Sequence, residues 1–237
     1  MIGKAKELLK QTLLQYKAGN RRSAVEINHY SFDIINSFLP LPVFVPYTAW
    51  GMSPTGLLHV LNYISTYQPK VIAEFGTGIS TLYISKLIEQ NKLSSQLYSV
   101  DHDGQWLQQV QTMQQQAGIR PTHFVQAPLQ PAYTFKGQAL QWYDTSIIDK
   151  QIPRSQVAFL LIDAPPYKYP HARAGALLHY AAELEQGQTN YCMDDAHRKA
   201  EKEILRVLGI NNVTYLDYAM GGKRPQPYDT TPVSLFK

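Results

Sequence analysis

Four acidic residues stand at the ends of short apolar runs in this sequence. Asp101 ends the run QLYSVD, Asp163 ends VAFLLID, and Asp194 and Asp195 end NYCMDD. A carboxylate at the tip of a strand can accept hydrogen bonds from both hydroxyls of a ribose, and this is the chemistry that we expect of Asp101. Three carboxylates close together need protons or a cation to neutralise them, and oxygen ligands suit Mg²⁺. Asp163, Asp194 and Asp195 are therefore the candidate ligands of a magnesium ion.

A glycine-rich turn, EFGTGIS, follows the first apolar run of the alternating region. Gly76 and Gly78 allow a tight turn from a strand into a helix, with the backbone close to a ligand. The dinucleotide-binding fingerprint would have a third glycine where this chain has Thr81, which argues against a nicotinamide or flavin cofactor. Asp101 and Asp103 both precede a predicted helix, so helix capping is the alternative role for either, and we favour it for Asp103.

From residue 70 onward, short apolar runs alternate with amphipathic stretches. The apolar runs predict strands at 71–75, 96–101, 122–127, 157–163 and 190–195. The amphipathic stretches predict helices at about 80–90, 105–117, 171–185 and 196–208. Near-continuous apolar strands separated by helices indicate a parallel sheet that is covered on both faces. At the end of the chain, NVTYLDY and VSLFK predict an antiparallel hairpin beside that sheet.

The predicted fold is α/β, a Rossmann-like, doubly wound, mostly parallel seven-stranded sheet with an antiparallel C-terminal hairpin. We expect residues 70–237 to form this unit and residues 1–69 to form an N-terminal helical extension or lid. The amphipathic stretch over 4–17 predicts a helix that packs against the body or against a second subunit. Ser53 and Pro54 suit the N-cap and first position of a second helix, which ends near residue 67.

The composition of the chain narrows the class of protein. Its 237 residues are enough for one α/β domain with a sizeable core. The single cysteine, Cys192, excludes an internal disulfide framework, and we find neither a secretory signal nor a run of membrane-spanning length, so we expect a cytoplasmic protein. The net charge is +4, and the basic residues are scattered, which argues against nucleic acid as a partner.

At this point the sequence resembles a known family, the class I S-adenosylmethionine-dependent methyltransferases. VIAEFGTGISTLYIS is similar to their glycine-rich first motif, and LYSVDHDGQWL is similar to their second. Together with APL…WYD, LLIDAPP and MDDAHRKAE, these stretches resemble a small bacterial branch often called methyltransferase domain 24. The resemblance covers roughly residues 50–220.

The resemblance implies roles for particular residues. The methionine part of the cofactor would lie against Gly76, Thr77, Gly78 and Ser80. Glu74 would help to hold its amino group, Asp101 would bind the ribose, and His102 would lie near the adenine side. The stretch from Ala127 to Leu129 could line the adenine pocket, but that pocket is less well defined, because the acidic residue that often follows the third strand in other methyltransferases is absent.

The stretch FLLIDAPPYKYP bears on the methyl acceptor. In the methyltransferases of nucleic-acid amines, an acid or amide directly precedes Pro-Pro-Tyr and accepts a hydrogen bond from the target amine. Here Ala164 occupies that place, and a methyl group cannot accept a hydrogen bond. The alternative is that Asp163 acts with Asp194 and Asp195, as in the metal-dependent O-methyltransferases of the catechol and macrolide types, where Mg²⁺ orients two substrate oxygens.

Methyl transfer also needs a group that removes the proton of the acceptor. We predict Asp163 and His197 as the catalytic residues, because His197 follows the acidic pair and has a suitable unperturbed pKa. His171 and Lys168 are competing candidates, and both lie in the loop after Pro166. The remaining candidates would shape an acceptor pocket or close over it: Tyr167, Tyr169, Arg173, Tyr47 and Trp50.

The sequence thus favours an S-adenosylmethionine-dependent enzyme that methylates an oxygen of a small molecule, with Mg²⁺ as a candidate aid. Two alternatives stay open. One is a nucleic-acid methyltransferase, and the other is a non-catalytic S-adenosylmethionine-binding protein in which the acidic residues merely cap helices. Assembly into a homo-oligomer stays open as well.

Overall fold

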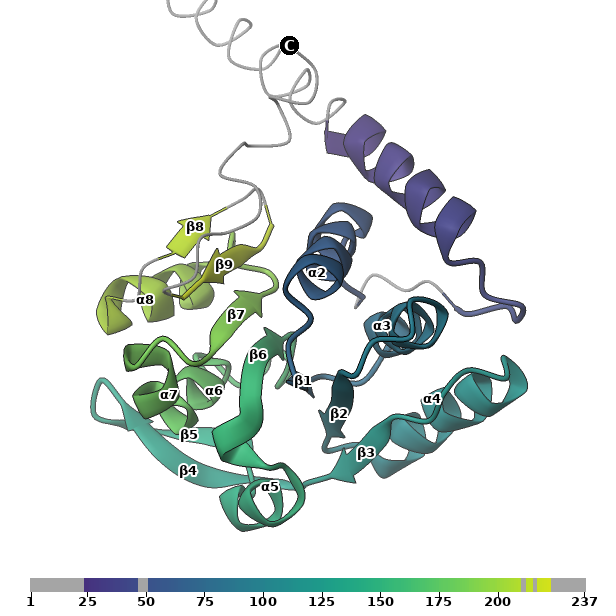
Figure 1. Cartoon of the computed structure of the whole chain (residues 1–237). Helices are drawn as coiled ribbons and strands as arrows, with labels where there is room; N and C mark the ends of the chain where they lie inside the picture. Colours follow the sequence, from purple (N-terminus) through teal and green to yellow (C-terminus); the bar gives the residue numbers. More distant parts are fainter. Residues whose placement is uncertain (1–23, 47–50, 210–211, 215–216, 223–237) are drawn as a thin grey trace, which may run out of the picture.

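The computed structural model describes residues 24–46, 51–209, 212–214 and 217–222. Four of the expectations lie outside these residues, namely the helix over 4–17, the two lid candidates Tyr47 and Trp50, and the strand at 233–237. A helix over 24–38 precedes the elements labelled in Figure 1. Among the described residues, no helix combines the length and the apolar character that crossing a membrane requires.

Seven strands form one sheet in the order β3-β2-β1-β6-β7-β9-β8, and β4 pairs with β5 in a separate antiparallel hairpin (Figure 1). The strands are β1 (Val71–Phe75), β2 (Gln96–Asp101), β3 (His123–Gln126), β4 (Leu129–Phe135), β5 (Gln138–Tyr143), β6 (Val157–Ile162), β7 (Asn190–Met193), β8 (Asn212–Thr214) and β9 (Ala219–Gly221). The helices are α2 (Pro54–Tyr67), α3 (Ile79–Gln90), α4 (Gly104–Gln116), α5 (Thr145–Gln151), the 3-10 turn η1 (Arg154–Gln156), α6 (Ala174–His179), α7 (Ala181–Glu185) and α8 (Lys199–Leu208).

The five strands β3, β2, β1, β6 and β7 are parallel to one another. At the edge of the sheet, β9 pairs with β7 and with β8 in antiparallel orientation. This architecture confirms the predicted Rossmann-like, mostly parallel seven-stranded sheet. Among the described residues, the C-terminal edge consists of β8 and β9, which pair with each other in antiparallel orientation. A short connection brings such neighbouring segments together at little entropic cost.

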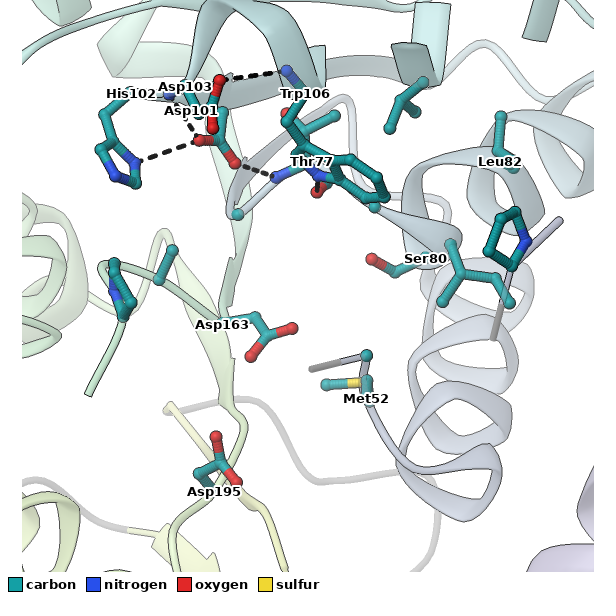
Figure 2. A pocket seen from close by; sticks show the side chains of 18 of the residues that line it. Met52, Thr77, Ser80, Leu82, Asp101, His102, Asp103, Trp106, Asp163 and Asp195 are labelled. Carbon is teal, nitrogen blue, oxygen red and sulfur yellow. Dashed lines mark hydrogen bonds and ion pairs between the residues drawn. The ribbon is translucent and has the colours of Figure 1, made fainter. Parts of the chain in front are cut away.

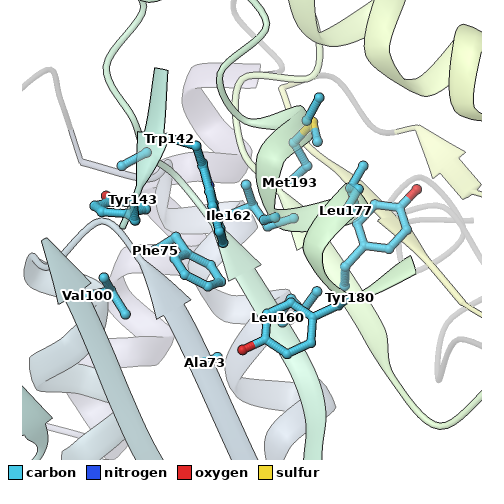
Figure 3. Close-up of a cluster of buried hydrophobic side chains, with 14 of the residues drawn as sticks. Ala73, Phe75, Val100, Trp142, Tyr143, Leu160, Ile162, Leu177, Tyr180 and Met193 are labelled. Carbon is cyan, nitrogen blue, oxygen red and sulfur yellow. The ribbon is translucent and has the colours of Figure 1, made fainter. Parts of the chain in front are cut away.

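The alternation of side chains along the strands divides the core into two parts. Ile72 and Phe159 point to the face covered by α2, α3 and the helix over 24–38. Phe75, Leu160 and Ile162 point to the opposite face, where they pack with aromatic side chains (Figure 3). Both faces of the sheet are therefore buried, which explains why its strands read as continuous apolar runs.

The β4–β5 hairpin is the element that the sequence analysis missed. It reverses at Lys136 and Gly137, which both have positive φ angles of the kind that two-residue hairpin turns require. Trp142 at its end is fully buried and packs on Phe75 (Figure 3). A Cβ atom at Gly175 would lie 2.3 Å from the Trp142 ring, so glycine is needed where α6 crosses the hairpin. The hairpin thus supplies the core under one face of the sheet.

The helix boundaries follow their capping residues. Ser53 accepts a hydrogen bond from the Gly56 amide at 3.1 Å, and α2 begins at Pro54 as predicted. The helix predicted over 171–185 is divided into α6 and α7, and α8 begins at Lys199 because residues 194–198 form turns. Those turns and the loop before α6 carry the polar residues of the site.

The order in which the chain adds strands to the sheet reverses beside β1. From β1 the chain proceeds to β2 and β3 on one side, and then returns to β6 and β7 on the other. In open α/β sheets, ligands bind beyond the carboxyl ends of the strands at such a reversal. The fold therefore directs attention to the loops after β1, β2, β6 and β7.

Candidate cofactor and acceptor site

A cavity of about 330 Å³ lies at this reversal point, a volume within the range of small-molecule sites (Figure 2). We call one part of it the glycine end, which consists of Gly76, Thr77, Gly78, Ser80 and Asp101. We call the other part the acidic end, which consists of Asp163, Asp195, Arg173 and Arg198 in the cavity wall together with the buried Asp194. In Figure 2 the carboxylates of Asp101 and Asp163 point into the same open space.

The two glycines of the turn have different reasons to be glycine. Gly76 has a φ of +110°, and a Cβ atom there would lie 3.0 Å from the Cβ of Ala164. Its amide donates to the carbonyl of Val100 at 2.9 Å, which ties the turn to β2. A Cβ atom at Gly78 would meet no protein atom within 4 Å, although Gly78 lines the cavity. Gly76 is therefore required by the fold, whereas Gly78 keeps space open for a ligand.

Asp101 is held firmly at the tip of β2. Its Oδ2 accepts from the Thr77 amide at 3.1 Å, and its Oδ1 accepts from the Asp103 amide at 2.9 Å. The Nδ1 atom of His102 lies 3.1 Å from the same Oδ1. Asp103 caps α4, as predicted, by accepting from the amides of Gln105 and Trp106. The carboxylate of Asp101 thus joins the glycine turn to the second strand and still lines the cavity.

Glu74 lies behind the turn and does not line the cavity. Its carboxylate accepts hydrogen bonds from three hydroxyls, those of Ser80 at 2.5 Å, Thr81 at 2.6 Å and Ser99 at 2.6 Å. Complete burial raises the pKa of Glu74 to about 7, and these hydroxyl donors act against that increase. The structure therefore does not bring Glu74 to the place where it could hold an amino group. Its contacts brace the glycine turn.

An apolar wall beside the glycine end was not predicted. It is formed by Trp106, Val110 and Met113, which follow one another along one side of α4, with Val45 and Pro46 from the N-terminal segment. The Trp106 indole donates to the Thr77 carbonyl at 2.6 Å. The spacing of the three α4 residues was a usable signal, since positions three and four apart share a helix face.

The stretch from Ala127 to Leu129 does not line the cavity, so the structure does not support the adenine pocket expected there. Ala127 is fully buried in the core, and its amide donates to the Asp101 carbonyl at 3.0 Å. Leu129 begins the unpredicted hairpin strand β4. The physical reason is that this segment turns under the sheet to start the hairpin instead of forming a rim.

At the acidic end, the three predicted carboxylates do converge. Asp163, Asp194 and Asp195 each have an oxygen within 4.8 Å of the others. The guanidinium of Arg173 lies among them, with Nη2 at 3.1 Å from Asp163 Oδ1 and 3.0 Å from Asp195 Oδ2. Arg198 Nη1 lies 2.8 Å from the same oxygen of Asp195. Two arginines therefore already pair with two of the three carboxylates of this cluster.

The acidic end favours protonated carboxyl groups. Burial, and next the negative charge of Asp194, raises the pKa of Asp163 well above its usual range, although Arg173 opposes this shift. Burial, and next the charge of Asp195, raises the pKa of Asp194 to about 6. Asp163 and Asp194 are thus suited to retain a proton between them near neutral pH.

Of the candidate bases, the structure brings only Asp163 to the cavity among the residues that it describes. His197 is exposed and does not line the cavity, because the turn at 194–198 points it to solvent. His171 Nε2 pairs with Glu203 Oε2 at 2.8 Å, and Lys168 lies over the ring of Tyr169 at 5.1 Å. These three residues therefore do not face the site.

Of the candidates for an acceptor pocket, some line the cavity and one does not. Tyr167 and Arg173 line the cavity, as do Ala164 and Pro166. Tyr169 does not line it. The wall of the acidic end thus combines carboxylates, guanidinium groups and one aromatic ring.

Searches with the sequence gave no matching family model and no matching curated protein. The predicted resemblance to the domain 24 branch therefore stays a prediction. Similar solved structures exist nevertheless. The Podospora anserina methyltransferase PaMTH1, bound to S-adenosylhomocysteine, matches with a TM-score of 0.52 at 10% identity, over 88% of this chain and 96% of that one.

Two further structures have the same architecture. An O-methyltransferase from Bacillus cereus, in complex with S-adenosylhomocysteine, matches with a TM-score of 0.51 at 13% identity, over 84% of this chain and 91% of that one. The methyltransferase domain of METTL16 matches with a TM-score of 0.51 at 13% identity, over 83% of this chain and 78% of that one. The chain therefore has the fold of the class I S-adenosylmethionine-dependent methyltransferases.

Proposed function

We propose that this protein is an S-adenosylmethionine-dependent methyltransferase that methylates an oxygen of a small molecule. The observation that carries the proposal is the pairing of Asp101 with the glycine turn at the reversal point of the sheet. Gly78 leaves open space in front of that turn, and Asp101 presents a fixed carboxylate beside it. A fixed carboxylate next to an open backbone turn suits a nucleoside whose ribose hydroxyls both donate.

The glycine end fits the parts of this cofactor in order. The methionine part would lie over Gly76, Thr77 and Gly78, with Ser80 in the wall, and Asp101 would bind the ribose. His102 lines the cavity next to Asp101, on the side expected for the adenine. The carboxylate of Glu74 would act from behind, because its three hydroxyl partners fix the start of α3.

The acidic end would supply the general base that removes the proton of the acceptor. S-adenosylmethionine carries an electrophilic methyl group, and its transfer to an acceptor oxygen leaves the electron pair of the broken carbon–sulfur bond on sulfur. Asp163 lines the cavity next to the glycine turn and would take the proton that the acceptor hydroxyl loses. It would act as this general base in the state in which the proton shared with Asp194 lies on Asp194.

A nucleic-acid amine is a poorer acceptor for this site. Ala164 occupies the wall position that would have to accept a hydrogen bond from the amine, and its side chain is a methyl group. The net charge of +4 supplies no concentrated basic surface for a polyanion. Both observations favour a small molecule.

The first test is calorimetric titration of the full chain with S-adenosylhomocysteine. We expect one site per chain and no competition by NADH. Gly78→Val is the matched variant, since a Cβ atom there meets no protein atom within 4 Å and lies in the space that the cofactor would need. A wild-type protein without measurable affinity for S-adenosylhomocysteine or S-adenosylmethionine would refute the proposal.

The second test addresses the acceptor. Tritium-labelled S-adenosylmethionine is offered with matched pairs of phenols and anilines, and of aliphatic alcohols and amines. We expect label only in the hydroxyl members. Transfer to amines instead would contradict O-methylation, and binding without transfer to any acceptor would favour the non-catalytic alternative.

A further inference from the structure

The structure assigns to the guanidinium of Arg173 the place that a divalent cation would need at the acidic end, so that this site works without a metal ion. The consequence for catalysis rests on the proposed function, but the placement of the cation does not. Metal-dependent O-methyltransferases hold Mg²⁺ with an acid after the fourth parallel strand of the sheet and an acidic pair after the fifth. This chain has both sets of acids and places an arginine among them.

Arg173 is anchored and is not a side chain that could swing aside. Its Nη2 contacts Asp163 Oδ1 and Asp195 Oδ2, and also donates to the Asp163 carbonyl at 2.5 Å. Its Nη1 donates to the Asp194 carbonyl at 2.6 Å. Only 5% of the side chain is exposed. The guanidinium thus joins the loop after β6 to the turn after β7 through side chains and backbone at once.

A metal ion would have to share this position. Mg²⁺ binds carboxylate oxygens at about 2.0–2.1 Å, and it would need the oxygens of Asp163 and Asp195 between which Nη2 already lies. The ion would then stand against a fixed positive charge at short range, in a largely buried place where repulsion is weakly screened. The residues present therefore do not fit the predicted magnesium ion.

The carboxylates of the acidic end already have cationic partners without a metal ion. Arg173 lies 3.1 Å from Asp163 and 3.0 Å from Asp195, and Arg198 lies 2.8 Å from Asp195. The two guanidinium groups thus offset two of the three carboxylate charges at the place where a metal ion would have to bind.

The arrangement also bears on the acceptor. A metal ion grips two neighbouring oxygens of its substrate, which restricts such enzymes to catechol-like or vicinal groups. Arg173 uses Nη1 and Nη2 for the protein itself, and only its Nε has no hydrogen-bond partner among the described residues, so it does not present two open positions for neighbouring oxygens as a metal ion does. The acceptor therefore needs a single hydroxyl beside Asp163, and a second adjacent hydroxyl brings no advantage.

The test is titration of the full chain with Mn²⁺, followed by calorimetry and by the electron paramagnetic resonance signal of free Mn²⁺. We expect no binding to the wild type at millimolar Mn²⁺. Arg173→Met keeps much of the apolar volume but frees the carboxylates, and we expect it to gain one site with a dissociation constant of about 10⁻³ M or below. Arg198→Met is the matched control, because Arg198 pairs with Asp195 and lies over the ring of Tyr167, and its removal leaves Arg173 in place.

Unpaired carboxylates could prevent Arg173→Met from folding, so Arg173→Met/Asp194→Asn serves as a second variant that retains the two carboxylates facing the cavity. Circular dichroism checks the fold of each variant. A wild type that binds Mn²⁺ with one-to-one stoichiometry, and loses it in Asp163→Asn, would overturn the inference. So would a folded Arg173 variant that gains no site. None of these readouts needs methyl transfer, so they remain valid if the proposed activity is wrong.

Discussion

The glycine end and the acidic end lie in one cavity but are built from different parts of the chain. The glycine end is local: Gly76 to Ser80 form one turn, and Asp101 on the neighbouring strand holds it through the Thr77 amide. The acidic end joins two separate loops, and its centre is Arg173, which comes from neither of the strand tips that carry the acids. A turn and one adjacent strand thus form the proposed nucleoside site, whereas the proposed acceptor site depends on a long-range contact.

This difference determines what each end tolerates. At the glycine end, backbone amides donate hydrogen bonds to a few fixed side chains. A substitution there therefore either reduces the space for a ligand or strains the backbone. The acidic end is a balance of charges in which one removal leaves the others unpaired. Substitutions at the glycine end should therefore change mainly cofactor affinity, and substitutions at the acidic end should change mainly the rate of methyl transfer.

The largest effect is expected from Asp163→Asn. The amide can still accept from Arg173 but cannot take up the acceptor proton, so we expect the rate of methyl transfer to fall by about 10²- to 10⁴-fold. Initial rates of S-adenosylhomocysteine formation, with the hydroxyl acceptor found in the panel, measure this. Affinity for S-adenosylhomocysteine should stay close to that of the wild type, since Asp163 belongs to the acidic end. An equal loss of binding would show that the two ends are not separate.

The next largest effect is expected from Asp101→Ala. Hydrogen bonds to a charged group contribute about 1.5–3 kcal/mol, so the dissociation constant for S-adenosylhomocysteine should rise by about 10- to 100-fold. Calorimetry measures it. Asp144→Ala is the matched control, because Asp144, like Asp101, accepts from the backbone amide two residues ahead, here that of Ser146, but does not line the cavity. An unchanged affinity in Asp101→Ala would remove the ribose role.

Much of the fold could be predicted because its signals are local. The five parallel strands were visible as apolar runs, and Ser53 and Pro54 fixed the start of α2. The β4–β5 hairpin was missed because its strands carry exposed polar residues on one side, and its turn, Lys136 and Gly137, is an unusual pair for a two-residue hairpin. Its burial comes from tertiary contacts such as that between Trp142 and Gly175, which no local pattern shows.

The candidate site also has features that the sequence predicted and features that it did not. Asp101, Gly76, Gly78 and the convergence of the three acids followed from the rule that ligands gather at strand ends. The positions of Glu74 and Arg173 did not follow, because the sequence cannot show which neutral or charged partners a buried carboxylate has already found. The Glu74 carboxylate accepts hydrogen bonds from hydroxyls, and the carboxylates of Asp163 and Asp195 pair with the Arg173 guanidinium.

A smaller effect separates the two glycines of the turn. Gly76→Ala places a side chain at a φ of +110° and against Ala164, so we expect a loss of about 1–3 kcal/mol of unfolding free energy. Gly78→Ala meets no protein atom and should leave the urea midpoint nearly unchanged while weakening cofactor binding. Urea unfolding and calorimetry on both variants check the distinction. A destabilised Gly78→Ala with normal binding would show that the turn has been assigned the wrong glycine.

The smallest expected effect concerns pH, and it compares a buried acid from each end. The folded-state pKa of Glu74 is about 7 against an ordinary value of 4.5, so the folded protein holds a proton there that the unfolded chain releases. Stability from this group is fully present below about pH 4.5 and is lost as the pH rises to about 7. For Asp194 the same loss occurs between its ordinary value of 3.8 and about pH 6.

Glu74→Gln and Asp194→Asn remove these two contributions separately. Melting temperatures at pH 5, 6, 7 and 8 should show the wild type losing stability relative to Glu74→Gln up to about pH 7, and relative to Asp194→Asn only up to about pH 6. Burial is the largest cause of the rise in both groups, and the windows differ mainly because the ordinary pKa is 4.5 for Glu74 and 3.8 for Asp194. If both differences ended at the same pH, the two buried acids would ionise alike, and this contrast between the two ends would not hold.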